Sequence, residues 1–225
     1  MISYKAKRKG MTGILEIAQE LYFVDRSENY MLDNGAFHSG LNRSKLELGA
    51  QEIDILFERF ETTTRPGFLD YTDLINQLKY GGLNESRHEI LQEFFAKLDH
   101  KAADVIDLRI MSNLFNARNH FDVKGGRRTQ DEIDGQFKDA LQIYSKISNG
   151  SSVVDYQGFV DFWSYLAPSV LKDTDFEYLA RACFRFNELP NKGQVAGSSK
   201  HGKKDARIVE PALGDRSIDN LKTLG

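Results

Sequence analysis

Cysteine, proline and long apolar runs are all scarce in this chain of 225 residues. A single cysteine, Cys183, cannot form an internal disulfide, which is typical of proteins that fold in a reducing compartment. Four prolines leave room for long helices. No run of about 18 apolar residues occurs, so we expect no membrane-spanning helix. The first ten residues lack the apolar segment of a secretory signal, and no glycine follows Met1 to accept a myristoyl group.

Catalytic and nucleic-acid motifs are missing as well. The five histidines show no metal-ligand spacing such as His-Glu-x-x-His. Cys183 falls on an apolar helix face, where a thiol is usually packed rather than nucleophilic. Residues 125–128 do not form a phosphate-binding loop, and the lysines near the C-terminus lack the interleaved aromatic residues that stack on bases. We therefore expect no enzymatic activity, no nucleic-acid partner and no membrane partner.

An internal repeat is the strongest positive signal. An aspartate recurs at intervals of 37, 37 and 48 residues, each time directly after Leu, Ile or Val and four residues before another apolar side chain. An amphipathic stretch of helical period precedes every copy. A helix, a short polar loop and a second helix, repeated four times, are typical of paired EF-hands. The four repeated aspartates are Asp33, Asp70, Asp107 and Asp155.

The repeat predicts an all-α fold of four EF-hand helix–loop–helix units in two paired lobes, with short β-bridges between the loops. The first two loops are expected to pair across Leu32 and Leu69, and the last two across Ile106 and Val154. A C-terminal helix and an extended tail complete the chain. The expected segments are a basic arm (1–11), the first EF-hand pair (12–82), the second pair (83–170), the C-terminal helix (171–188) and the basic tail (189–225).

Helix start signals agree with this repeat. Thr12 precedes the first helix and Asn84 precedes the third. Thr129, with Glu132 three residues later, makes a capping box at the start of the fourth entering helix. The apolar stripes of these helices could line grooves for a target, but we assign them to the core, because core packing is the common role of such stripes.

A calcium-binding EF loop supplies oxygen ligands from positions 1, 3, 5, 9 and 12 and carries glycine at position 6. The first loop, 25–36, has Tyr30 at the glycine position. It also has Ala36 at position 12, where a bidentate carboxylate normally binds. This loop is nevertheless the best candidate metal site of the chain. Its four remaining oxygen donors are Asp25, Ser27, Asn29 and Asp33.

The second loop, 62–73, keeps two carboxylates, Asp70 and Asp73. Position 5 is Pro66, which offers neither a side-chain oxygen nor a backbone N–H. The first position is a threonine, unless Glu61 serves there with one inserted residue. These remnants fall short of the ligand set that a tight calcium site needs.

The last two loops are poorer still. The third, 99–110, has Lys101 at position 3, and an ammonium group there repels a cation. The fourth, 147–158, retains Asp155 as its only carboxylate. We therefore expect no bound cofactor and no calcium binding at physiological levels, with weak binding left open for the first loop.

The repeated aspartate itself has a structural explanation. Position 9 begins the exiting helix, where an aspartate side chain accepts hydrogen bonds from free backbone N–H groups and interacts with the helix dipole. Such a cap contributes about 0.5–2 kcal/mol, with or without calcium. We therefore predict that all four aspartates cap the exiting helices, and a residual metal role is the alternative.

The segment after the third loop resembles the calcyphosin family of EF-hand proteins. The shared features are a His-x-x-Val motif, a stretch of glycine and basic residues, Thr-x-Asp-Glu, a spaced phenylalanine, an aromatic run ending in Ser, and an Asp-x-x-Phe helix. The resemblance covers about residues 12–187 and is specific in the second half. The matching positions are 120–123, 125–128, 129–132, 137, 159–169 and 173–176.

The resemblance implies an EF-hand fold and calcium binding through several hands, but this chain departs from the calcium pattern in every loop. It also implies an association with cilia and flagella, where degenerate EF-hand proteins are fixed parts of the axoneme. We therefore expect a calcium-insensitive structural or adaptor protein of the cytoplasm and cytoskeleton, in a ciliary or flagellar axoneme. The alternative is a cytosolic calcium sensor or regulatory subunit that binds an amphipathic target helix.

The charge distribution adds a hypothesis about partners. Residues 1–10 carry four cations and no acid, and residues 190–225 carry a net charge of +3. Because the whole chain carries −3, the body between them is strongly acidic. Basic ends could simply keep terminal segments soluble, or they could steer the protein to acidic surfaces such as tubulin or another axonemal protein. The candidate partner-binding residues are Lys5, Lys7, Arg8, Lys9, Lys200, Lys203 and Lys204.

Overall fold

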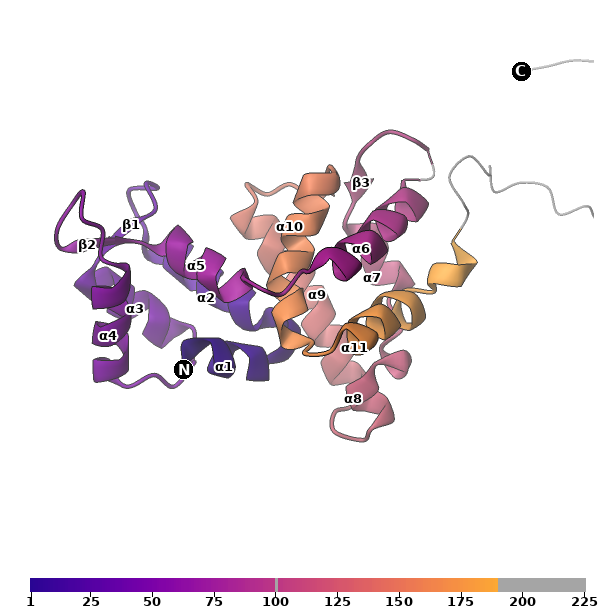
Figure 1. The fold of residues 1–225 in the computed structure, drawn as a ribbon, viewed down its shortest axis with the longest axis horizontal. Helices are drawn as coiled ribbons and strands as arrows, with labels where there is room; N and C mark the ends of the chain where they lie inside the picture. The colour runs from indigo at the N-terminus through magenta and orange to yellow at the C-terminus, as the bar shows by residue number, and fades with distance from the viewer. Residues whose placement is uncertain (100, 190–225) are drawn as a thin grey trace, which may run out of the picture. The chain divides into compact units, whose positions relative to one another are not determined.

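The computed structural model of the chain is mostly helical, as predicted (Figure 1). It describes residues 1–99 and 101–189. Apart from Leu189, the predicted tail lies outside the described residues, and so do its three candidate lysines. Within the described part, no helix is both long and apolar enough to cross a membrane.

The first half of the chain contains two helix–loop–helix units joined through a two-stranded sheet. Leu32 in β1 pairs with Leu69 in β2 in antiparallel register, so the predicted pairing across these residues is confirmed. The elements of this half are α1 (Ile2–Arg8), η1 (Gly10–Thr12), α2 (Gly13–Val24), β1 (Met31–Asp33), α3 (Asn34–Arg43), α4 (Ala50–Phe60), β2 (Phe68–Asp70) and α5 (Tyr71–Lys79).

The second half repeats this arrangement with a longer connection between its two units. Ile106 in β3 pairs with Val154 in β4, again as predicted. The elements are α6 (Glu85–Leu98), β3 (Ile106–Asp107), α7 (Arg109–Leu114), η2 (Ala117–Asn119), α8 (Phe121–Lys124), α9 (Gln130–Ile147), β4 (Val153–Val154), α10 (Tyr156–Leu166), η3 (Ala167–Ser169), α11 (Asp173–Tyr178), η4 (Leu179–Cys183, a π-helical turn) and η5 (Phe186–Glu188).

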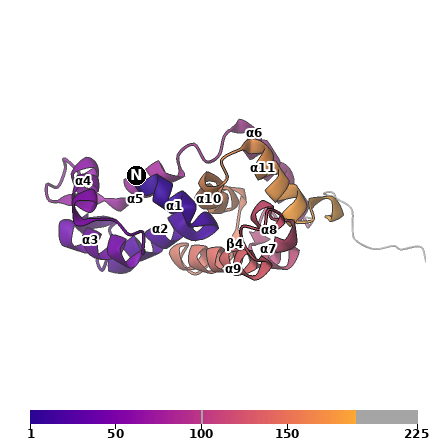
Figure 2. The same cartoon turned by 90° about the horizontal axis from the view of Figure 1, so that it is seen from below.

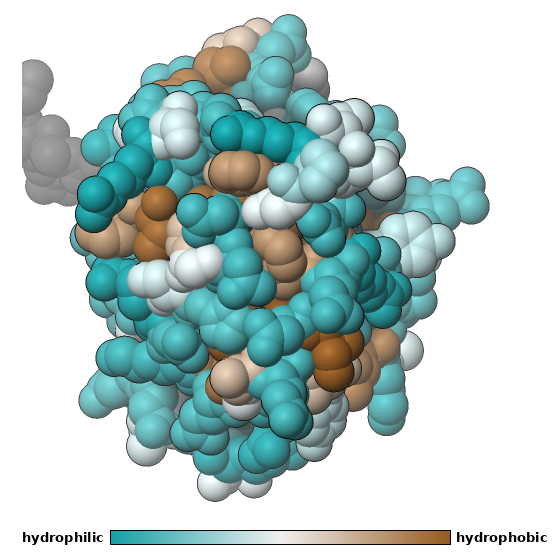
Figure 3. All heavy atoms as spheres, turned by 90° about the vertical axis from the view of Figure 1, so that its left-hand side faces the viewer, coloured by the Kyte–Doolittle hydropathy of each residue, from teal (hydrophilic) through white to brown (hydrophobic). Residues whose placement is uncertain are grey.

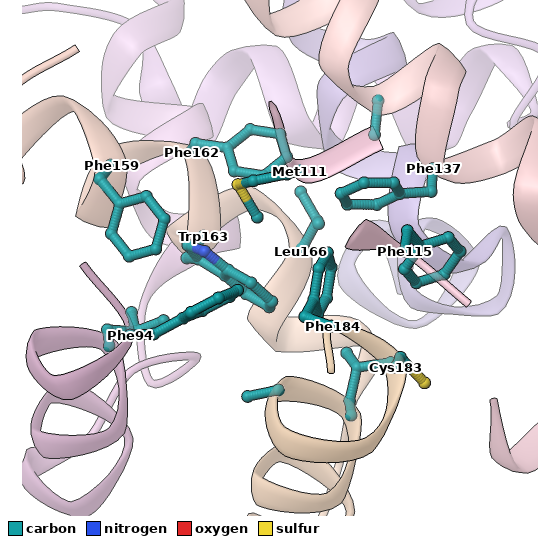
Figure 4. Close-up of a cluster of buried hydrophobic side chains, with 14 of the residues drawn as sticks. Phe94, Met111, Phe115, Phe137, Phe159, Phe162, Trp163, Leu166, Cys183 and Phe184 are labelled. Carbon is teal, nitrogen blue, oxygen red and sulfur yellow. The ribbon is translucent and has the colours of Figure 1, made fainter. Parts of the chain in front are cut away.

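Two hydrophobic clusters, one for each half, hold these units together. In the first half, Leu32 and Leu69 of the sheet lie in the same cluster as Phe37 and Leu74, the apolar residues that follow the repeated aspartates. In the second half, Phe94, Phe159 and Trp163 form part of a cluster dominated by aromatic side chains (Figure 4). The periodic apolar residues of the sequence are therefore core residues, as expected.

The predicted C-terminal helix is shorter and less regular than a single α-helix over 171–188. The α-helix ends at Tyr178, a π-helical turn follows, and Arg185 adopts a left-handed conformation with φ of 50°. From Phe176 onward the segment packs into the second cluster, where Cys183 and Phe184 are buried (Figure 4). Burial raises the pKa of the Cys183 thiol to about 12, which fits a packed residue rather than a nucleophile.

Residues 1–11, expected to form a basic arm, fold as α1 and most of η1; α1 packs against the first half, and Met11 of η1 lies in the second cluster. Ile2 and Ala6 of α1 lie in the first cluster. Helix α1 approaches α2 so closely that a Cβ atom added to Gly13 would lie 2.0 Å from the carbonyl oxygen of Ala6. Only glycine fits at this contact, so the N-terminal segment is an integral part of the fold.

Candidate metal loops and the basic N-terminal surface

Asp25, which opens the first loop, is committed to contacts inside the protein. Its side chain is only 5% exposed. Oδ2 accepts a hydrogen bond from the backbone N–H of Tyr30, at 2.7 Å, and another from the hydroxyl of Tyr71, at 3.2 Å. Burial, and with it the negative charge of Asp25, holds the pKa of Tyr71 well above its ordinary value. The tyrosine hydroxyl therefore remains a proton donor to this carboxylate.

The other candidate donors of the first loop are only partly gathered. Asp25, Ser27 and Asp33 line one hollow of about 510 Å³, together with Ala36. Asn29 does not line this hollow, and its side-chain oxygen accepts the N–H of Met31 at 3.0 Å. Two arginine side chains, Arg26 and Arg43, also line the hollow. Their positive charge makes the hollow unfavourable for a metal cation.

The backbone of the first loop makes the left-handed turn that glycine favours, although a tyrosine stands at that position. Tyr30, at the position of the usual glycine, has a φ of 65°. A left-handed conformation is strained for a bulky residue. The ring of Tyr30 lies 5.9 Å from that of Tyr71, and its carbonyl accepts the N–H of Tyr71. The loop is therefore held in its turn by contacts to the second loop.

In the second loop, Glu61 rather than Thr62 makes the contact that corresponds to Asp25. The carboxylate of Glu61 accepts the N–H of Gly67 at 2.6 Å. The hydroxyl of Thr62 instead shares a hydrogen bond with Thr64. Asp73, the other remnant of this loop, lies exposed on α5. The local geometry therefore fits the alternative in which the loop begins at Glu61 and contains one inserted residue.

The third loop repeats the pattern of the first. Asp99, which opens it, is buried. Its two oxygens accept the backbone N–H groups of Ala103, at 2.8 Å, and Asp104, at 3.1 Å. Ala102 and Asp104 have φ values of 51° and 58°, so this loop also turns through left-handed residues that are not glycine. The carboxylate that opens the loop therefore holds the loop's own backbone.

The fourth loop has no room for a position-12 carboxylate in its present backbone. A Cβ atom added to Gly158 would lie 2.9 Å from the Cβ of Val154. Real Cβ atoms do not approach that closely, so a larger residue requires a shift of the strand or the helix. The same tight approach lets the side chain of Asp155 accept the N–H of Gly158 at 2.8 Å.

The four repeated aspartates all accept backbone N–H groups at the start of the exiting helices. Asp33, Asp70 and Asp155 are the N-cap residues of α3, α5 and α10. Asp107 lies one residue before the N-cap of α7 and accepts the N–H of Arg109 at 3.0 Å. Side-chain hydrogen bonds from the same arginine lower the pKa of Asp107 to about 2.

Among residues 1–99 and 101–189, no three histidine, cysteine, aspartate or glutamate side chains come close enough together to hold a metal ion. The first loop offers two carboxylates to its hollow, and one of these is held by Tyr30 and Tyr71. The other carboxylate is occupied as a helix cap. An ion in this hollow would compete with the bonds to Oδ2 of Asp25 and Oδ1 of Asp33, whereas Oδ1 of Asp25 is buried and has no hydrogen-bond partner among the described residues.

The cations of the N-terminal segment differ in what they contact. Lys5 donates to the carbonyl of Glu47, at 2.7 Å, and pairs with Glu52, at 3.2 Å. Lys9 pairs with Glu16 and donates to the carbonyl of Ser44. The two remaining cations differ in position: Arg8 is exposed beside the ring of Tyr4, and Lys7 is half-buried.

Two functional contacts were not visible in the sequence. Tyr71 reaches Asp25 from 46 residues away. Arg87, only 4% exposed, donates to the carbonyls of Gly82, Ala167 and Val170. Arg87 lies on the apolar face of α6, three residues before Ile90, so its burial had a signal in the sequence. Its acceptors, and the contact of Tyr71, are revealed only by the tertiary structure.

No family model matches this chain. Among curated proteins, the chain is similar to crustacean calcium-binding protein 23 of Faxonius limosus. The two are 24% identical over 168 residues, which span 75% of this chain and 81% of that protein. The aligned region is therefore long enough to include most of the helix–loop–helix units, whereas the identity is low.

Proposed function

We propose that this chain is a non-enzymatic EF-hand protein that acts as a structural or adaptor component and is largely insensitive to calcium. This proposal depends on one observation, which is that the carboxylates that open the first and third loops accept hydrogen bonds from the protein itself. Asp25 and Asp99 accept hydrogen bonds from the backbone of their own loops, and Tyr71 adds a further bond to the first. Both oxygens of Asp99 and Oδ2 of Asp25 therefore have partners without a metal, whereas Oδ1 of Asp25 is buried without a hydrogen-bond partner among the described residues.

The second lobe supports the proposal because its apolar interior is filled by the chain itself. A calcium sensor binds an amphipathic target helix in a hydrophobic groove. Here α11 and the π-helical turn place Phe176 and Phe184 against Trp163, with ring centroids 5.5 and 5.6 Å apart (Figure 4). A target helix would have to displace this segment. The runner-up function, a cytosolic regulatory subunit that binds a target helix, is therefore less well supported.

One face of the first lobe shows no broad apolar surface (Figure 3). In the view from the side that carries α3 and α4, hydrophilic side chains cover most of the surface and hydrophobic ones are scattered (Figure 3). Lone exposed apolar side chains are normal on a soluble surface. Ile2 and Ala6 show that α1 covers part of this lobe's core (Figure 2).

The contacts between the two halves favour a fixed arrangement. Lys79 of α5 pairs with Asp161 of α10 at 2.5 Å, and the hydroxyl of Tyr144 donates to the same carboxylate. Arg87 joins the connection between the halves to the end of α10 and, through Asp173, to α11. Because a buried guanidinium is costly to leave unpaired, these bonds oppose separation of the parts.

A second candidate function is weak calcium binding in the first loop. It is favoured by the hollow that Asp25, Ser27 and Asp33 share, and by the similarity to a protein whose name describes it as calcium-binding. That similarity supports a calcium-binding role in general. The missing carboxylate at Ala36 limits such a site to weak affinity, because the bidentate ligand contributes strongly to EF-hand binding.

Isothermal titration calorimetry separates these functions. We expect no calcium binding at micromolar concentrations for the full chain. Ala36→Glu restores the missing ligand and should give measurable binding if the first loop retains its donors, and Ala36→Gln is the control of similar size without the charge. A dissociation constant near 1 µM for the unmodified protein, as in calcium sensors, would refute the proposal.

We further propose that the partners are tubulin or other proteins of a ciliary or flagellar axoneme. The resemblance to the calcyphosin family supports this location, and the exposed guanidinium of Arg8 supports an acidic partner. Expression of the tagged protein in a ciliated cell provides the test. A signal retained in detergent-extracted axonemes is expected, whereas a diffuse signal absent from them would contradict the axonemal assignment.

A further inference from the structure

A small basic hollow lies between α1 and the connection that joins α3 to α4. Its volume is about 310 Å³. Figure 1 shows this connection passing beside α1, near the N-terminus. Four of the six lining residues are cations, and the lining also contains one leucine and one acid. They are Lys5, Arg8, Lys9, Lys45, Leu46 and Glu47.

The two lysines at the base of the hollow fix its shape. Lys5 donates to the carbonyl of Glu47, and Lys9 donates to the carbonyl of Ser44 at 2.8 Å. These bonds hold the connection at two points, one on each side of Lys45. Lys45 and Glu47 both have a φ of 54°. Two left-handed residues other than glycine so close together are uncommon, and such conformations occur often at functional sites.

The hollow keeps donors that the protein itself does not use. The ammonium groups of Lys5 and Lys9 each have three N–H donors and use two of them. One donates to a backbone carbonyl, and the other donates to an acidic partner, which is Glu52 for Lys5 and Glu16 for Lys9. The side chains of Arg8 and Lys45 make no hydrogen bond or ion pair within residues 1–99 and 101–189. A guanidinium has five N–H donors and binds carboxylates in a bidentate manner.

The charge balance leaves the hollow positive. The acids Glu16 and Glu52 offset Lys9 and Lys5, respectively. Glu47 offsets at most one of the two remaining cations, Arg8 and Lys45. The apolar Leu46 lies in the lining, and the exposed ring of Tyr4 lies next to Arg8. A basic hollow with an apolar wall suits an anion carried on a short aliphatic stem.

We propose that this hollow binds a glutamate or aspartate side chain in an acidic segment of a partner protein. Arg8 and Lys45 bind the carboxylate, and the exposed ring of Tyr4 contacts the neighbouring apolar groups of the segment. This proposal rests on the proposed adaptor function and names the site through which the adaptor binds. Of the four cations of the N-terminal segment that were predicted to bind a partner, the proposal keeps the three that line the hollow, Lys5, Arg8 and Lys9.

The test measures binding of a fluorescein-labelled peptide of about ten glutamates to the full chain by fluorescence polarisation. Arg8→Gln and Lys45→Gly should each weaken binding about tenfold, because each removes a charge-assisted contact. Glycine tolerates the left-handed conformation at position 45, so Lys45→Gly should unfold at the same or a higher urea concentration. Loss of binding in this variant therefore cannot come from loss of folding.

Lys7→Gln is the matched control, because Lys7 lies on the same helix and does not line the hollow. This variant should bind within about twofold of the unmodified protein, since a surface charge outside the site acts only at long range. Equal weakening by Lys7→Gln, or no peptide binding at all, would overturn the proposal. Competition by inorganic phosphate or stronger binding to vesicles of anionic lipid would also overturn it, in favour of a phosphate site. Calcium calorimetry on the same samples tests the proposed function separately.

Discussion

At the scale of single residues, the carboxylates that open the first and third loops accept hydrogen bonds from groups of the protein itself. Asp25 receives a backbone N–H and a tyrosine hydroxyl, and Asp99 receives two backbone N–H groups. Three of the four repeated aspartates are helix N-caps, and the fourth, Asp107, accepts a backbone N–H from one residue before the N-cap. The capping role was predictable from sequence because it depends on residues two or three positions away. The contact between Tyr71 and Asp25 was not predictable from the sequence, since the two residues are 46 positions apart.

Tyr71→Phe tests the contact with Asp25. The substitution keeps the ring in place and removes the hydroxyl that donates to a buried carboxylate. A hydrogen bond to a charged group contributes about 1.5–3 kcal/mol, so we expect the free energy of unfolding in urea to fall by that amount. Tyr30→Phe is the control, because the Tyr30 hydroxyl makes no hydrogen bond within the described residues, and it should change stability by less than about 0.5 kcal/mol. Equal effects of both variants would contradict this role of Tyr71.

The pairing of Asp107 with Arg109 gives a prediction about pH. Because the folded-state pKa of Asp107, about 2, lies below the ordinary value of about 3.9, the ionised carboxylate stabilises the fold above pH 4. This contribution disappears as the pH falls from about 4 to 2. It is small, below about 1 kcal/mol, because the guanidinium is exposed. Arg109→Gln should raise the pKa of Asp107 towards the ordinary value in an NMR titration, and an unchanged midpoint would contradict the assignment.

At the scale of elements, the repeat predicted most of what forms. The strand registers across Leu32 and Ile106 follow from aligning the aspartates. The caps at Asn84 and Thr129 follow from local sequence, and both are observed. Thr12 is different, because it stands before α2 without a capping hydrogen bond from its side chain. Its hydroxyl instead donates to Glu16.

The end of the C-terminal helix could not be read from local sequence. Residues 173–187 have helical spacing, which predicts one continuous helix. Phe184 and Phe186 are both fully buried near Phe94, however. Residues two positions apart lie on nearly opposite faces of an α-helix, so both rings reach the core only if the helix ends before them. The left-handed Arg185 between them provides that break, so tertiary packing overrides the local preference.

Phe184→Ala tests whether this segment is part of the core. Phe184 contacts the rings of Phe94, Phe115, Phe137 and Trp163. Loss of a buried phenylalanine costs about 3–5 kcal/mol, which chemical denaturation followed by tryptophan fluorescence will measure. The control is Leu171→Ala, because Leu171 is 82% exposed and its loss should cost less than about 0.5 kcal/mol. A cost below about 1 kcal/mol for Phe184→Ala would show that the segment does not fill the groove.

At the scale of the whole described chain, the contacts between the halves bear on function. Ile147 and Tyr165 pack against both hydrophobic clusters. Lys79 and Asp161 add an ion pair between α5 and α10. The sequence indicated two EF-hand pairs but not how they join, because the joining residues have no local signature. An assembly component benefits from such fixed geometry, whereas a sensor needs a lobe that opens on binding calcium.

The most direct test of the central claim compares the amide and indole NMR spectra of the full chain in a calcium chelator and in about 10 µM free calcium, where sensor sites fill. The account predicts that the indole resonance of Trp163 and the amide resonances of α10 and α11 coincide in the two spectra. Residues of the first loop, around Asp25, could shift slightly at higher calcium concentrations without affecting the claim. Large shifts at Trp163 and along α11 at about 10 µM calcium would show that the second lobe opens, and would contradict the account.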